Sequence, residues 1–338
     1  MATVKTIGGA VGRDFSTTQG WEDWAGAQLT SDQWGECYDD GTNLGAVLIG
    51  YWTTWPTVGA YPRLYTPLSE RHNGKKTGGG AYLQAVGDVV FVFRLAYVRI
   101  EGLRIRMTGA GNGVSMAGDY VPFDGAIVAD NCITYDSVLG GNYGVYVEQY
   151  DAGTVTTPPV VRNNIIYGNG YLGSAVGVAA YTATDGNAEF YNNTAYGCVT
   201  AGLYTFADAG FPPFVPGSTM TVTVKNNEFL NCGTDYLWDV DAATSSNNMS
   251  SDGTADDQGG SGHIVSVTAS KQFMAVDDLR HRMGSQCLDA GTTIASFSTD
   301  CFGTARPLGS AWDMGAFEGA VRPPIPPGGV IVGSMMQY

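Results

Sequence analysis

Charged residues, and cationic ones above all, are scarce in this chain of 338 residues. Asp, Glu, Lys and Arg make up 14% of it, and 17 basic side chains face 32 acidic ones, which gives a formal net charge of −15. A surface of that sign repels phosphate backbones and anionic lipid head groups. We therefore expect neither nucleic acid nor a membrane among the partners.

Long apolar stretches are also missing. No segment approaches the ~18 uninterrupted apolar residues of a membrane-spanning helix, and the start MATVKTIGGAVG lacks the apolar core of a secretory signal. The six cysteines form no CxxC pair and are too sparse for a disulfide scaffold. These absences predict a chain made in a cytoplasm, with most cysteines as buried thiols.

The sequence is rich in what strands and turns use. It has 48 Gly and 19 Tyr, and 44% of its residues are hydrophobic. A pattern of alternating apolar residues that ends in a polar pair recurs roughly every 20–35 residues, the interval typical of solenoid repeats. The repeats begin at Val98, Ile127, Val160, Ala188 and Thr223, with a weaker copy at Ser245.

Two residue types mark each repeat. A glycine leads into a second short strand at Gly113, Gly144, Gly177 and Gly202. The second residue of each polar pair should stack on its equivalent in the next coil about 4.8 Å away, so that asparagines can hydrogen-bond along the axis. We align these positions as Gly102, Asn131, Asn164, Asn193, Asn227 and Asn248.

These markers predict an all-β, right-handed parallel β-helix. Cys198 and Cys232 each follow their asparagine by five residues, so we expect them on neighbouring coils as thiols, with a disulfide as the less favoured alternative. The segment from Phe15, with Trp21, Trp24 and Leu29 at helical spacing, predicts a helix that closes the N-terminal end.

Four regions follow from these patterns. We expect a cap with irregular strands over 1–86, the regular coils from near Gly87 over 87–268, and a C-terminal cap that closes the other end over 269–319. Residues 320–338 combine a Pro-rich stretch with an apolar terminal peptide.

Both ends resemble known families. TVKTIGGAVGRDFSTTQGWEDW is similar to the opening of β-helix proteins encoded among the structural genes of tailed bacteriophages. LRHRMGSQCLDAGT and the later DMGAFE, Asp313 to Glu318, resemble the closing cap of right-handed β-helix proteins with a choice-of-anchor C-terminus. The phage resemblance implies a decoration protein, tail fibre or tailspike, and such proteins are often trimeric. It also implies that the partners are other virion proteins and that the chain is located in the virion, which is assembled in the host cytoplasm.

Under this resemblance, the chain must attach to the particle through one of its ends. We favour the terminal peptide from Arg322, because the rod follows its N-terminal cap directly. The expected anchoring residues are Arg322, Ile325, Val330, Ile331, Val332, Met335, Met336 and Tyr338.

An enzyme remains the alternative. Glycosidases need two carboxylates ~5–10 Å apart, and Glu148, Asp151, Asp185 and Asp208 end the second strands of neighbouring coils. The sequence motifs of polygalacturonases and the Asp-His of the pectate lyase core are absent. We therefore favour the interpretation that these four residues are solvated carboxylates in turns. The alternative is that they are the catalytic acids of a tailspike polysaccharide depolymerase, either a hydrolase or a lyase. The three histidines lie in unlike contexts and there is no Gly-x-Ser-x-Gly elbow, which disfavours a nucleophilic triad.

Metals and cofactors find little support. The Asp-rich stretch from residue 239 to 257 lacks the spacing of an EF-hand, so it is interpreted as a polar loop. We predict no metal site and no cofactor.

Aromatic residues gather in two places that suit a binding surface. They could bury a subunit interface, stack against host glycans, or pack within a lid; the first is favoured. They are Tyr51, Trp52 and Trp55, and, on the second strands, Tyr146, Tyr181, Tyr204 and Phe206. The sequence thus predicts a trimeric structural protein of a phage particle, with a depolymerase and a bacterial surface adhesin as alternatives.

Overall fold

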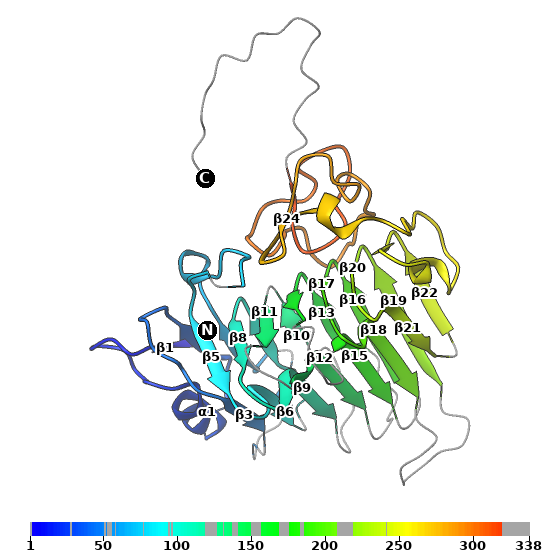
Figure 1. Ribbon diagram of the computed structural model, residues 1–338. Coiled ribbons are helices and arrows are strands. Elements are labelled where there is room, and N and C mark those ends of the chain that lie inside the picture. The colour runs from blue at the N-terminus through cyan, green and yellow to red at the C-terminus, as the bar shows by residue number, and fades with distance from the viewer. Residues whose placement is uncertain are drawn as a thin grey trace, which may run out of the picture.

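The computed structural model is a stack of parallel strands with one side covered by the C-terminal part of the chain (Figure 1). It describes residues 2–27, 29–50, 52, 56–57, 59–76, 78–93, 95, 97–118, 127–130, 132–136, 141–149, 157–168, 176–182, 186–207, 219–240 and 242–319. No helix in this part of the chain is long and apolar enough to cross a membrane.

Three parallel sheets run along the rod, and from β4 onward successive strands of the chain pass from the first sheet to the second and then to the third. The first sheet contains β1 (Thr3–Ile7), β2 (Gln33–Cys37), β4 (Pro62–Tyr65), β7 (Arg99–Glu101), β10 (Ile127–Asp130), β13 (Val160–Arg162), β16 (Gly186–Tyr191), β19 (Met220–Lys225) and β22 (Ala242–Ser246). The second contains β5 (Tyr82–Ala85), β8 (Arg104–Met107), β11 (Ile133–Asp136), β14 (Ile165–Tyr167), β17 (Thr194–Tyr196), β20 (Glu228–Leu230) and β23 (Met249–Ser250). The third contains β3 (Val47–Gly50), β6 (Val90–Phe93), β9 (Gly111–Gly118), β12 (Gly141–Gln149), β15 (Val176–Thr182), β18 (Ala201–Ala207) and β21 (Thr234–Asp239).

This architecture confirms the predicted parallel β-helix. Parallel pairing already begins at β1, however, so the sheets extend well before Gly87, where we expected regular coils to start. The early strands lack the Asn marker, so the sequence repeat does not indicate them. Apolar side chains of every coil fill the interior.

The turn between the first and second sheets uses the polar pair in two ways. The first member, as at Asn192 with φ 52°, takes the left-handed backbone conformation. The second member, Asn193, is fully buried, and its Nδ2 donates to Asn227 Oδ1 at 2.9 Å on the next coil. The ladder continues from Asn164 to Asn248.

The predicted alignment of the two earliest positions is off by one residue. Asp130 pairs with Arg162, so Cys132 rather than residue 131 lies beside Asn164. Gly102, with φ 71°, belongs with the left-handed first members of the pairs. Residue 131 itself lies outside the described part of the chain.

The glycine markers form a second column, where β9, β12, β15 and β18 begin their run across the third sheet. A Cβ on Gly144 would lie 2.6 Å from Gly177 O, and one on Gly177 would lie 2.4 Å from Gly202 O. Side chains cannot fit at this separation, so the close approach of successive coils requires glycine here. This column confirms the second predicted marker.

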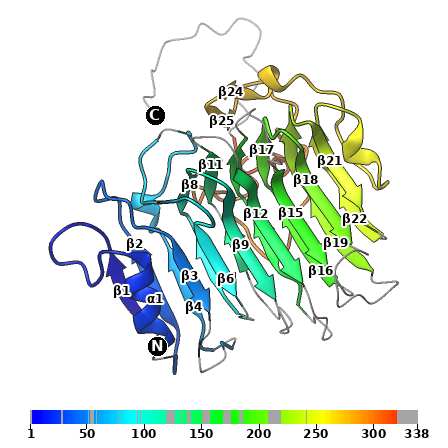
Figure 2. The same ribbon diagram turned by 60° about the horizontal axis from the view of Figure 1, so that its bottom comes forward.

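The N-terminal helix is also confirmed. It forms α1 (Thr18–Gly26), capped by Thr17, whose side chain accepts a hydrogen bond from Gly20 N. Trp21 is fully buried, and the helix packs over β1, β2 and β3 at the N-terminal end of the rod (Figure 2).

The predicted C-terminal cap, residues 269–319, does not close the other end of the rod as we expected, and we call it the C-terminal segment. It lies along the outer side of the second sheet (Figure 1). Tyr167 on β14 donates through its hydroxyl to Gly74 O, and Leu279 N donates to that same hydroxyl. The segment contains β24 (Phe273–Ala275), β25 (Asp278–His281) and the 3-10 turn η3 (Ala269–Lys271).

The segment takes this position because three outer residues on neighbouring strands of the second sheet are apolar. Tyr167, Tyr196 and Leu230 pack against it in one buried cluster. The end of the rod is instead extended by bridges from Ser246 to Ser261 and from Met249 to Ile264. The remaining short elements are the 3-10 turns η1 (Leu68–Glu70) and η2 (Thr254–Asp256).

Candidate functional site

The outer face of the third sheet is where four of the predicted aromatic residues meet. Along β12, Val145 and Val147 point into the core while Tyr146 and Glu148 lie on the outside. The same alternation places Tyr181 of β15 on the outside.

Pairing between strands brings these rings into one cluster. Tyr181 pairs with Phe206 on the neighbouring strand, and their ring centroids lie 4.9 Å apart. Tyr204 stacks on Phe206 at 4.5 Å, and Tyr143 stacks on Tyr146 at 4.5 Å. We call these five residues, Tyr143, Tyr146, Tyr181, Tyr204 and Phe206, the aromatic face; their strands lie side by side in Figure 2.

Exposure varies across the aromatic face. Tyr181 is buried at 5%, whereas Tyr146, Tyr204 and Phe206 are half-buried. Ala179 lies between Tyr146 and Tyr204 in the same column and is fully covered by its neighbours. The aromatic face therefore presents ring edges and partly covered ring faces to its surroundings. Such a surface can pack against another apolar surface.

The first group of predicted aromatics does not belong to this face. Trp52 is 9% exposed and packs near α1, where its Nε1 donates to Glu22 at 2.5 Å. It is therefore part of the packing at the N-terminal end. Tyr51 and Trp55 lie outside the described residues.

The carboxylates proposed for catalysis are not assembled in the described part of the chain. Glu148 pairs with Ala117 on one side and Tyr181 on the other, so neither neighbouring strand supplies an acid at its level. The other three, Asp151, Asp185 and Asp208, lie outside the described residues, as do all the predicted anchoring residues from Arg322 to Tyr338.

Sequence reasoning missed a pair of carboxylates on the first sheet. Glu101 and Asp130 pair across β7 and β10, and each contacts an arginine: Arg63 lies 2.5 Å from Glu101, and Arg162 lies 2.6 Å from Asp130. Burial raises the pKa of Asp130 despite Arg162. The signal in the sequence was that β7 and β10 each end in an acidic residue.

This pair suits a structural role better than catalysis. Glu101 is 7% exposed and Asp130 4%, so a polysaccharide could not reach either carboxylate. Phe297 of the C-terminal segment covers Arg162, at 4.8 Å from its guanidinium carbon to the ring centroid. Each carboxylate thus contacts an arginine from a neighbouring coil, and removing either arginine would leave an unpaired buried charge.

The six cysteines are free thiols, as predicted. Cys198 and Cys232 lie on neighbouring coils, since Gly233 N donates to Cys198 O. The Asp-rich stretch is tied to its own backbone. Asp252 accepts from Asp235 N and from the amide and hydroxyl of Thr254. The stretch is not a loop throughout, as we expected, because it contains β22 and β23 of the last coil and the turn η2.

One group of side chains has the composition of a metal site. Glu228, His281 and Cys287 place their ligand atoms within 4.8 Å of one another beneath the C-terminal segment. Burial raises the pKa of Cys287 to about 11. The sequence offered no spacing signal for it, because the three residues come from distant parts of the chain.

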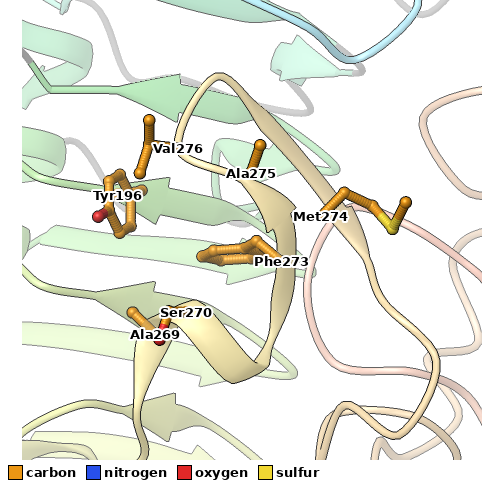
Figure 3. A pocket seen from close by; sticks show the side chains of 7 residues that line it. All are labelled: Tyr196, Ala269, Ser270, Phe273, Met274, Ala275 and Val276. Carbon is orange, nitrogen blue, oxygen red and sulfur yellow. The ribbon is translucent and has the colours of Figure 1, made fainter.

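A small apolar pocket lies between β24 and the second sheet (Figure 3). Its volume is about 130 Å³. The Tyr196 ring forms one wall and the side chains of Phe273 and Val276 face it, so the pocket suits a small apolar group and holds no catalytic pair. Its lining consists of Tyr196, Ala269, Ser270, Phe273, Met274, Ala275 and Val276.

Comparison with known proteins agrees with this architecture. The family described as "Right handed beta helix region" matches residues 89–273, more than half of the chain. The protein belongs to this right-handed β-helix family. No curated protein matches it.

Among solved structures, the chain is similar to the one titled "Crystal structure of pectate lyase Pel9A". The two share 13% identity, the match covers 94% of this chain and 97% of that one, and the TM-score is 0.39. A likeness of this degree concerns the type of fold alone. It carries no statement about pectate or any other substrate.

Proposed function

We propose that this chain is a structural component of a tailed-phage particle that assembles as a homotrimer through the aromatic face, without cleaving bonds. The observation that carries the proposal is the group of rings on β12, β15 and β18, which pack around Ala179 and its apolar neighbours. Aromatic rings are enriched in the cores of protein interfaces, where charged residues are depleted.

The distribution of charge supports the same surface. The strands of the third sheet contain only three charged residues, Glu148, Asp235 and Asp239, in an otherwise acidic protein. The strands of the first sheet contain nine. Six strand intervals make the third sheet about 29 Å long, enough to form the centre of an interface.

Oligomeric mass tests the proposal directly. Light scattering on the full chain should give a trimer, and Tyr204→Ser combined with Phe206→Ser should weaken it because both rings lose their apolar contact. Lys225→Gln on the first sheet is the matched control and should remain trimeric. A monomeric wild-type chain would overturn the proposed trimer. If this monomer were also retained on immobilised host polysaccharide, the aromatic face would be a glycan-binding surface instead.

The virion assignment needs a separate experiment. Mass spectrometry of purified particles should detect the chain, and deletion of residues 322–338 should abolish its incorporation while leaving the trimer intact. Incorporation of the shortened chain would contradict the proposed anchor. Release of new reducing or unsaturated ends from host polysaccharide, lost in Glu148→Gln, would contradict the structural role and favour a depolymerase.

A further inference from the structure

A buried polar cluster joins the rod to the C-terminal segment. Glu228 begins β20 on the outer side of the second sheet and is fully buried. His281 ends β25, and Cys287 follows in the next turn; the His281 side chain is 1% exposed and Cys287 is buried. The cluster thus takes one side chain from the rod and two from the segment that covers it.

The atoms of these side chains converge. His281 Nε2 lies 3.0 Å from Glu228 Oε2, and the three ligand atoms lie within 4.8 Å of one another. One carboxylate oxygen of the cluster, Glu228 Oε1, is buried without a hydrogen-bond partner. Native proteins leave few such atoms, and an unseen ion is a regular explanation.

The buried charges around the cluster do not balance. Four carboxylates are almost fully buried in this region, and the buried cations are Arg306 and, when protonated, His281. Backbone N–H groups donate to three of the carboxylates, whereas the carboxylate of Glu228 has His281 as its hydrogen-bond partner. A further cation beside Glu228 would therefore stabilise the region. The carboxylates belong to Glu228, Asp300, Asp313 and Glu318.

We propose that Glu228, His281 and Cys287 bind a zinc ion that fastens the C-terminal segment to the rod. A thiolate, an imidazole and a carboxylate together form a ligand set typical of Zn²⁺. Bonds of about 2.0–2.3 Å place the donor atoms of a tetrahedral site about 3.3–3.8 Å apart. His281 Nε2 and Glu228 Oε2 are already closer than this, and the most distant pair needs to approach by about 1–1.5 Å. A water molecule fills the fourth position.

Asp313 completes the arrangement from outside the coordination sphere. Its Oδ2 lies 3.8 Å from His281 Nδ1, on the side of the ring away from Glu228. Metal-binding histidines regularly direct their second N–H at a carboxylate, which fixes the ring for coordination. Coordination releases the Cys287 proton to solvent, and the resulting thiolate binds the ion.

Metal analysis of the full chain tests the site. Protein produced in zinc-supplemented medium and purified without chelator should contain about one zinc per chain, and Cys287→Ser or His281→Gln should reduce this more than tenfold. Cys301→Ser is the matched control, because it removes another buried thiol of the same segment while sparing the ligands.

A second measurement does not depend on how the variants fold. Wild-type protein stripped with a chelator and given Co²⁺ should develop a thiolate-to-cobalt charge-transfer band, and returning Zn²⁺ should raise its Tm. Wild-type protein that takes up neither ion would overturn the site. Full metal content in both ligand variants would overturn the ligand assignment.

Discussion

The backbone nitrogen of Cys132 donates a hydrogen bond of 3.0 Å to Asn164 Oδ1, so the asparagine ladder ends on a cysteine. Each ladder asparagine also donates through Nδ2 to a carbonyl on the preceding coil, as Asn164 does to Ala129 O at 3.0 Å. At the ladder's end, Cys132 Sγ faces the equivalent carbonyl, Ile100 O, at 3.9 Å. The acceptors for one more asparagine are therefore already in place.

We predict that Cys132→Asn extends the ladder and preserves or increases stability. Its Nδ2 would meet Ile100 O and Asn164 Oδ1, and two new buried hydrogen bonds contribute about 1 kcal/mol each in favourable cases. Thermal and chemical unfolding of the purified variant measures the effect. Cys198→Asn is the contrasting control: it places an amide in the apolar core and should cost about 2–3 kcal/mol. Equal losses in both variants would refute the ladder argument.

The ladder also shows how far the sequence could lead. Asn-Asn pairs gave the coil period and the buried stack from Asn164 onward, because paired amides need the same position in every coil. The earlier coils have no Asn-Asn pair: one carries Gly102 and the next a single polar pair before Cys132. The sequence therefore leaves open which of their residues align with the asparagines of the later coils. Only backbone pairing, such as Asp130 with Arg162, settles the register.

A methyl group at the glycine column should disrupt the rod. In Gly177→Ala the new Cβ would meet Gly202 O at 2.4 Å, which is backbone and cannot move without shifting a coil. We expect a loss of about 1–3 kcal/mol in the free energy of unfolding. Gly253→Ala is the matched control, since no atom lies within 4 Å of its Cβ and its φ of −96° suits alanine. Similar Tm values for both variants would contradict the tight contact.

The position of the C-terminal segment could not be predicted from repeat position alone. A segment that follows the last coil can close the end of the rod or turn back along its side, and the repeat pattern does not indicate which of the two occurs. The outer residues Tyr167, Tyr196 and Leu230 were a usable signal, because three stacked apolar positions on one face need a cover. The site residues beneath it were harder to find, since Glu228 and His281 meet across 53 residues.

Arg306 should be essential for holding that segment. Its guanidinium is fully buried, lies 2.9 Å from Glu318 Oε2 and donates to Gly315 O and to Asn163 Oδ1 on the rod. Arg306→Met leaves the Glu318 carboxylate buried without its partner, so we expect a loss of about 3–5 kcal/mol. Limited proteolysis should then cut the segment much faster than in wild type.

Two further variants separate this charge effect from a general loss of fold. Adding Glu318→Gln to Arg306→Met should recover part of the stability, because the unpaired charge is removed. Arg282→Met changes an exposed arginine of the same segment, which donates to Ser270 O, and should leave proteolysis unchanged. No recovery in the double variant would show that the hydrogen bonds to Asn163 and Gly315 dominate.

The N-terminal end should respond to pH through Glu22 of α1. Burial is the main cause that raises the pKa of this carboxyl, although Trp52, Gly50 and Gln19 donate hydrogen bonds to it. Below the ordinary carboxyl pKa the group is neutral in both states. As pH rises, the unfolded chain ionises first, so stability is lost until pH passes the raised pKa of the folded state.

Glu22→Gln removes this ionisation and keeps an oxygen that can accept from Trp52 and Gly50. The Tm of wild type relative to Glu22→Gln should therefore fall as pH rises from below the ordinary carboxyl pKa into the neutral range. Asp14 provides a control of opposite sign, because the Thr6 amide and Lys5 lower its pKa. Its stabilisation is present above the ordinary pKa and is lost as pH falls, so the Tm of wild type relative to Asp14→Asn should rise over the same range. Parallel pH profiles for the two pairs would refute the assigned burial of Glu22.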